Sequence, residues 1–142
     1  MEQPKLLKHI DDLKALQPDD LLKYDGEKLV KAQVQKYPLP VTSAAHLTDF
    51  NAFYYKDDYG MITISSLIEI TGTVNAFTPL AILPQGSRPL KKIAIPVLVF
   101  DYATENKTLF FGRILPNGEL YLENQVPGAA SVTINVTYLA EN

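Results

Sequence analysis

The sequence predicts a mainly β protein, an antiparallel β-sandwich or jelly-roll-like head preceded by a short N-terminal α-helical stalk. Three observations lead to this fold class. Short apolar runs follow one another through residues 41–142, and polar and apolar side chains alternate within them. Turn-forming pairs such as Pro-Gly and Asn-Gly separate these runs. A helical spacing of apolar residues stands in residues 4–17, at the N-terminus.

Residues 1–17 are predicted to form the stalk. Pro4 suits the first turn of a helix and Pro18 ends the pattern. A helix of about four turns is not stable alone in water, so its apolar stripe must pack on something. The partner is either the rest of its own domain or further copies of the same helix in a short coiled coil. The stripe consists of Leu6, Ile10, Leu13 and Leu16.

Residues 18–40 are predicted to form a junction. Asp25-Gly26 stands between two short runs, which favours a hairpin with a two-residue turn. Pro38 and Pro40 then stiffen the chain and prevent a helix. These features are typical of a connector between a stalk and a head.

Residues 41–142 are predicted to form the head domain. The alternation of side chains indicates sheets with one dry face, and such faces need a second layer, which favours a sandwich or jelly roll. Pro96 lies within the most apolar run, so we expect a bulge or a bend between sheets there. The expected strands are 48–56, 61–65, 67–75, 79–84, 92–101, 108–115, 118–123 and 131–139.

Composition excludes several classes of function. The net charge is −3, from 13 basic and 16 acidic residues, which argues against a general nucleic-acid binder. The absence of Cys excludes disulfides and thiolate metal sites, and with two His residues we expect no metal and no cofactor. The N-terminus has no apolar run of signal-peptide length, and the longest apolar stretch is too short to cross a membrane.

No signature of catalysis is visible. His9 and His46 lack the context of a catalytic triad, and no nucleotide-binding, zinc-protease or calcium-loop motif occurs. The adjacent carboxylates Asp57 and Asp58 point in different directions on a regular element, so they do not form an acid/base pair by themselves. We therefore expect that the protein is not an enzyme. The alternative is a carbohydrate-active enzyme whose two carboxylates are brought together by the fold.

The segment 50–60, FNAFYYKDDYG, is a candidate glycan-binding platform. Aromatic rings stack on sugar rings, and carboxylates accept hydrogen bonds from hydroxyl groups. The competing interpretation places Phe53 and Tyr55 in the core and makes KDDYG a hairpin turn. The candidates in this segment are Tyr54, Tyr55, Asp57, Asp58 and Tyr59.

Two further loops supply candidates for ligand binding. Arg88 has the planar fork that suits phosphate on a polymer such as teichoic acid, although it can instead bind loop carbonyls beneath Pro89. The polar segment 101–108 begins with Asp101 and Tyr102, and it is either a recognition loop or a long hairpin.

Several segments together resemble a known family. Residues 83–89, LPQGSRP, followed by the apolar run 93–99, resemble an "LPxGyRP…PV" segment in head domains of phage tail-tip and receptor-binding proteins, especially phages of Gram-positive hosts. LPNGELYL and TINVTYL resemble the later strands of these heads, and LLKYDGEKLV resembles a segment of phage fibres and baseplate proteins. The chain departs from these patterns at Leu29, where Trp is usual, and at Ser87, where an aromatic residue is common.

The resemblance implies a β-sandwich head, a helical stalk, a homotrimer and attachment to other phage baseplate or tail proteins. It also implies a virion protein that recognises a host cell-wall saccharide or teichoic acid at the bacterial surface. The alternative is a structural baseplate adaptor that binds no sugar. A receptor binder should gather aromatic and charged side chains in a cleft, whereas an adaptor should present a broad apolar patch.

Overall fold

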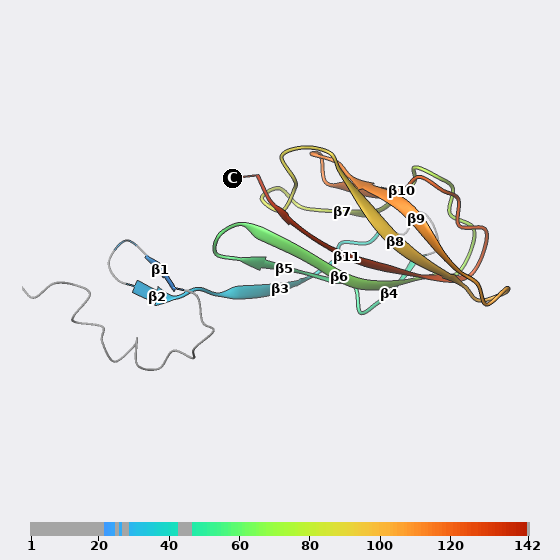
Figure 1. Ribbon diagram of the computed structural model, residues 1–142, viewed down its shortest axis with the longest axis horizontal. Coiled ribbons are helices and arrows are strands. Elements are labelled where there is room, and N and C mark those ends of the chain that lie inside the picture. The colour runs from blue at the N-terminus through green and yellow to red at the C-terminus, as the bar shows by residue number, and fades with distance from the viewer. Residues whose placement is uncertain (1–21, 25, 27–28, 43–46, 142) are drawn as a thin grey trace, which may run out of the picture. The chain divides into compact units, whose positions relative to one another are not determined.

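The computed structural model describes residues 22–24, 26, 29–42 and 47–141 (Figure 1). The chain divides into two compact units, Met1–Val34 and Gln35–Asn142. The helix expected in residues 4–17, with its stripe of Leu6, Ile10, Leu13 and Leu16, lies outside the described residues and stays a prediction.

The first unit contains the hairpin expected around Asp25-Gly26. Strand β1 (Leu22–Tyr24) pairs with β2 (Leu29–Lys31) in antiparallel register. Tyr24 is the partner of Leu29, so the connection is longer than the two-residue turn that the sequence suggested. Gly26 has a φ of 99°, which few other residues adopt, and its carbonyl accepts a hydrogen bond from the Tyr24 hydroxyl at 2.9 Å.

The second unit is built on one nine-stranded antiparallel sheet, which confirms the mainly β prediction. Its strands follow the order β3-β5-β6-β11-β8-β9-β10-β7, and β4 pairs with β6 beside β5. The C-terminal strand β11 therefore lies in the middle of the sheet. The strands are β3 (Val34–Pro38), β4 (Leu47–Phe50), β5 (Phe53–Asp57), β6 (Met61–Ile70), β7 (Pro79–Ile82), β8 (Ile93–Asp101), β9 (Lys107–Ile114), β10 (Glu119–Leu122) and β11 (Ala130–Leu139).

The sheet curls until its two ends meet. The segment that follows β3 pairs with β7, because Val41 forms a bridge with Ala81 and Thr42 donates its N–H to the Leu80 carbonyl at 2.9 Å. In Figure 1, β8, β9 and β10 consequently lie over β5 and β6. The two layers expected of a sandwich are thus halves of one continuous, curled sheet.

The core fills the space between these halves. Inward residues alternate with outward ones along β6, β8 and β11, as the period of two predicted. The largest fully buried side chains are Ile62, Ile64, Ile68, Ile70, Leu80, Leu83, Ile95, Ile114, Leu120, Leu122, Ile134 and Val97.

Two strand boundaries differ from the sequence prediction. Strand β6 runs unbroken where two strands were expected, and the predicted strand 48–56 is instead divided into β4 and β5. The division falls at Asn51, whose φ is 56°. Opposite it, the buried Ser66 hydroxyl donates to the Phe53 carbonyl at 2.6 Å and accepts from the Phe53 N–H at 2.8 Å. Ser66 therefore bridges β5 and β6 without leaving a buried polar group unpaired.

The bulge expected at Pro96 is absent, because β8 keeps an unshifted register with β9 through this residue. Asp101 donates its N–H to Asn106, on the β9 side of β8. Backbone donors alternate sides along a strand, so the missing donor of Pro96 faces β11. The β8–β11 pairing runs from Asp101 back to Val97, which pairs with Ile134 and directly follows the proline in the sequence. Pro96 thus removes no hydrogen bond and marks where β8 and β11 separate.

Candidate functional site

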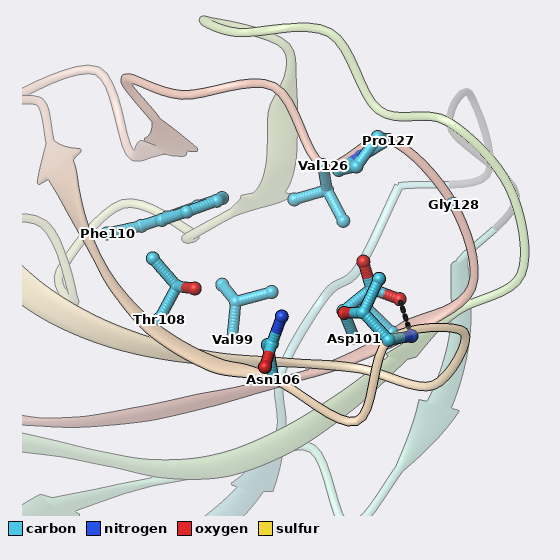
Figure 2. Close-up of a pocket in the computed structure, with 10 residues that line it drawn as sticks. Val99, Asp101, Asn106, Thr108, Phe110, Val126, Pro127 and Gly128 are labelled. Atoms are coloured by element: carbon cyan, nitrogen blue, oxygen red, sulfur yellow. Dashed lines mark hydrogen bonds between the residues drawn. The ribbon is translucent and has the colours of Figure 1, made fainter.

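One candidate site is a pocket at the β8–β9 end of the head, here named the Asp101 pocket (Figure 2). Its volume is about 260 Å³. One wall comes from β8, β9 and their connection, and the other comes from the segment before β11. The lining residues are Val99, Asp101, Thr104, Asn106, Thr108, Phe110, Val126, Pro127, Gly128 and Ala130.

The first wall is shaped by the Asp101 carboxylate itself. Its Oδ1 accepts hydrogen bonds from the N–H groups of Ala103 at 2.8 Å and Thr104 at 3.4 Å. This is the local turn that aspartate favours at the start of a loop. Glu105 then adopts a φ of 57°, which returns the chain to β9. The polar loop is thereby held in one conformation by its own sequence.

The second wall is fixed by backbone pairing. Val126 exchanges two hydrogen bonds with Val74, at 2.9 and 2.8 Å, and its side chain is fully buried. The carbonyl of Ala129 accepts the N–H of Tyr102 at 3.2 Å, which links the two walls. The pocket is therefore bounded on both sides by ordered backbone.

The pocket has an apolar side and a polar side. In Figure 2, Phe110 and Val126 face Asp101 and Asn106 across the open space. Pro127 lies beside Val126, whereas Val99 lies between Thr108 and Asn106 on the polar side. Asp101 is the single charged residue in this lining. A ring with one apolar face and several hydroxyl groups matches both sides at once.

The structure places the predicted loop residue Tyr102 just outside this pocket. Its side chain is exposed, and its hydroxyl donates to the Glu69 carboxylate at 2.7 Å. This hydrogen bond raises the pKa of Tyr102 above its usual value. The ring also meets Phe100 edge to face, with centroids 5.4 Å apart. Tyr102 thus supports the loop from its outer side.

The aromatic segment 50–60 does not form a single platform. Tyr54 is 4% exposed, and its ring stacks on Tyr37 with centroids 5.2 Å apart. Tyr54 therefore belongs to the core, although it was a candidate for glycan contact. Phe53 and Tyr55, which the competing interpretation placed in the core, are only partly buried. The run is aromatic at successive positions, so polarity could not reveal which ones point inward.

The remaining residues of this segment form a turn, as the competing interpretation held. Asp57 ends β5, and its Oδ1 accepts the N–H groups of Tyr59 and Met61, both at 2.9 Å. Lys56 donates from Nζ to the Gly86 carbonyl at 2.6 Å. The turn thereby meets the 83–89 loop around an open hollow of about 380 Å³. The hollow, here named the Asp57 hollow, is lined by Lys56, Asp57, Asp58, Tyr59, Gly60, Gly86 and Glu141.

Arg88 serves the structure of its own loop. Its Nε donates to the Leu83 carbonyl at 2.9 Å, and its carbonyl accepts the N–H of Glu141 at 2.7 Å. The interpretation of Arg88 as a partner of loop carbonyls is confirmed. The 83–89 loop is also bridged to the end of β11, because Pro89 pairs with Ala140.

The two hollows lie at opposite ends of the sheet. Ala130 of β11 is paired with Asp101 on one side and with Ile70 on the other, whereas Leu139 is paired with Met61. The predicted glycan-binding residues therefore fall into two groups, and Asp101 is separated from Asp57, Asp58 and Tyr59 by the length of β11. Asn106 and Thr108 were within the segment that the sequence indicated, but the wall at 126–130 was not, because no local pattern links it to Asp101.

A second feature of the head is an apolar outer face on β8 and β9. Leu98 lies opposite Leu109 and Pro96 lies opposite Phe111 in the strand register. All four are exposed, and the exposed fractions of Leu109 and Phe111 are 59% and 56%. This set is named the β8–β9 face. Side chains of this size are seldom left in water side by side unless something covers them.

No protein-family model matches the chain, and no match is found among curated proteins. Within the described part of the chain, no three His, Asp or Glu side chains gather in a way that could hold a metal ion. The same part contains no helix that is long and apolar enough to cross a membrane.

Proposed function

We propose that this chain is a phage tail or baseplate receptor-binding protein. Its β head, in the sandwich-like form implied by the resemblance, is displayed as a homotrimer on the virion and recognises a host cell-wall saccharide. The resemblance of residues 83–89 and of the later strands supports the class of protein. The observation that carries the binding function is the lining of the Asp101 pocket, which joins an apolar wall to uncommitted hydrogen-bonding groups.

The chemistry of the pocket suits a sugar. Aromatic and aliphatic surfaces such as Phe110 and the exposed Pro127 cover the apolar face of a pyranose ring, while carboxylate, amide and hydroxyl groups bind its hydroxyls. The volume of about 260 Å³ is below the roughly 300–1,000 Å³ of pockets for drug-sized ligands. The pocket therefore fits one terminal or branching sugar residue of a polymer.

The position of the pocket also supports adsorption. Leu39 donates its N–H to Ala52 and Tyr37 stacks on Tyr54, so the beginning of β3 lies near the β5–β6 turn. The chain thus reaches the sheet at the end that holds the Asp57 hollow. The Asp101 pocket lies at the other end of the sheet, the length of β11 away from that entry point. A receptor-binding site at the end of the sheet away from β3 suits a head attached through its N-terminal side.

The β8–β9 face supports assembly of several copies. Its occupant in this proposal is a second copy of the chain, because the neighbouring charges Arg113 and Glu123 neutralise each other at 2.6 Å. A surface whose charges are already paired meets its own copy without like-charge repulsion. The same face favours the structural adaptor as the second candidate function, in which another virion protein covers it.

Binding to purified Gram-positive cell walls tests the proposed function. Asn106→Ala removes a side-chain amide from the pocket, and we expect it to lower the bound fraction in a sedimentation assay several-fold. Asn124→Ala is the matched control, because Asn124 is an exposed asparagine outside the pocket lining. If the wild-type protein binds no cell wall from a panel of Gram-positive hosts, the structural adaptor is the better account.

A further inference from the structure

We propose that the sugar held in the Asp101 pocket carries no negative charge: it is a neutral or amino sugar, and phosphate groups of a wall polymer stay outside. This inference rests on the proposed function and narrows it. It also separates the two ligands that the sequence left open, a saccharide and the phosphate backbone of a teichoic acid.

The first step is the state of the Asp101 carboxylate. Oδ1 is bound by two backbone N–H groups, while Oδ2 has no donor among the described residues. Asp101 is half-buried, and it lines the pocket. An acceptor oxygen with this placement binds a sugar hydroxyl or an ammonium group well, and it repels a phosphate.

The second step is the absence of a basic group on the pocket side. None of the lining residues is Lys, Arg or His. Lys107 is close in sequence, but it alternates with the lining residues Thr108 and Phe110 along β9 and belongs to the opposite face of the strand. Recognition of a phosphate normally needs Arg, Lys or a cluster of backbone N–H groups, and this lining shows no such basic side chain.

The third step is the charge around the pocket. Glu69 lies beside the loop, where it accepts the Tyr102 hydroxyl, and Glu105 is exposed within the loop. Together with Asp101 these carboxylates outnumber the nearby Lys107, which pairs with Phe100 at the start of β9, so the charge around the pocket is net negative. An acidic rim attracts an ammonium group and disfavours a polyanion, most strongly at low salt.

The fourth step concerns the neutral groups. The side chains of Asn106, Thr104 and Thr108 form no hydrogen bond with other described residues, and all three lie on exposed positions that face the pocket. Amide and hydroxyl groups both donate and accept, so they match sugar hydroxyls, which do the same. The polar side of the pocket is therefore complete for a neutral or amino sugar without any basic side chain.

The test compares glucose with two derivatives of opposite charge, one carrying an ammonium group and one carrying a phosphate. Glucose, glucosamine and glucose 6-phosphate are titrated into the full-length protein, and binding is followed by saturation-transfer NMR and calorimetry at low and moderate salt. We expect glucosamine and glucose to bind, and glucose 6-phosphate to bind at least about tenfold more weakly than glucose. Asp101→Asn keeps the Oδ1 acceptor for the loop but removes the charge, and it should weaken glucosamine binding about tenfold.

The same experiment separates the inference from the function beneath it. Preferential binding of glucose 6-phosphate, or glucosamine binding that Asp101→Asn leaves unchanged, overturns the inference about charge while the head remains a saccharide binder. Failure of every sugar, together with failure to bind cell walls, overturns the proposed function itself. Asn124→Ala again serves as the control with native affinity.

Discussion

Single residues show how closely the loops of the head are tied to its strands. The hydroxyl of Tyr138, in β11, donates to the carbonyl of Ser87 at 2.6 Å in a buried position. Burial raises the pKa of Tyr138 above its ordinary value. This bond connects the central strand to the 83–89 loop, and the small buried Ser87 stands where the resembling phage heads often have an aromatic residue.

Replacing Tyr138 by phenylalanine tests this bond. Tyr138→Phe leaves the Ser87 carbonyl without its donor, and we expect the free energy of unfolding to fall by about 1–2 kcal/mol in chemical denaturation at neutral pH. Tyr55→Phe, at a half-buried tyrosine whose hydroxyl forms no hydrogen bond with other described residues, should change it by less than about 0.5 kcal/mol.

Comparing wild type with Tyr138→Phe also tests how the free energy of unfolding depends on pH. Tyrosine in the unfolded chain ionises near pH 10, whereas the folded Tyr138 keeps its proton to higher pH. Its contribution to stability is therefore fully present below about pH 10 and is lost as the pH rises toward the folded-state pKa. Wild type should lose stability more steeply than Tyr138→Phe above pH 10. If the free energy of unfolding falls with pH in parallel for the two proteins, Tyr138 is not the group responsible for the loss of stability above pH 10.

At the residue scale, the sequence indicated Asp101 as a candidate for binding but could not assign the aromatic residues. Asp101 is followed by a polar loop, and a lone carboxylate at a strand end is a visible signal. Tyr54 and Tyr55 are chemically alike and adjacent, so only the pairing of Tyr54 with the buried Ile64 decides which one faces the core.

At the scale of elements, the turn between β9 and β10 was predictable from the sequence. The sequence Pro116-Asn117-Gly118 predicted a tight turn, and it connects β9 with β10. Gly118 has a φ of 93°, and its carbonyl accepts the N–H of Leu83 at 2.9 Å. A side chain at this position would meet both an unfavourable backbone conformation and the neighbouring loop.

Substitution at this turn should be severe. In Gly118→Ala the added Cβ would lie 2.3 Å from the Leu83 carbonyl oxygen and 2.9 Å from the Arg88 Nε, so backbone must shift. We expect a loss of about 2–4 kcal/mol in the free energy of unfolding, measured by thermal and denaturant unfolding. Gly128→Ala, where nothing lies within 4 Å of the added carbon, is the matched control and should be close to neutral. Equal effects of the two substitutions would contradict this view of the turn.

Strand positions were predictable for a physical reason, and the exceptions have one as well. The alternation of polar and apolar side chains along a strand is visible in a single sequence. Most strands of the head were therefore expected close to where they lie. The division at Asn51 and the continuity through Ser66 depend on hydrogen bonds between β5 and β6, which no local pattern reveals. A bulge or a bend between sheets was expected at Pro96. The bulge is absent, and the end of the β8–β11 pairing at this residue is not a local property of the sequence.

At the scale of the whole head, the sequence predicted an antiparallel β structure but not its topology. The central place of β11 between β6 and β8, and the closure of the sheet through Val41 and Ala81, are pairings between distant segments. The Asp101 pocket has the same origin, since its walls at 99–110 and 126–130 meet only when β11 enters the sheet. Its position therefore became visible only in the folded chain.

In the proposed function, each pocket binds sugar weakly, and the pockets on several copies of the head act together. Linking identical sites raises the overall affinity for a repeating polymer by orders of magnitude without any new contact. In this account the β8–β9 face contributes to the link between copies, and Phe111 and Leu109 within it are each more than half exposed. Removing the apolar character of this face should separate adhesion from sugar binding.

The most direct measurement compares the mass in solution and the cell-wall binding of wild type with those of Phe111→Ser. Light scattering should give three chain masses for wild type and a smaller assembly for the variant. The variant should keep its affinity for a single sugar while losing at least about tenfold in wall binding. Leu139→Ser, at an exposed leucine outside the β8–β9 face, should match wild type. The account would be contradicted by a wild-type protein that is a monomer in solution and still binds cell walls strongly.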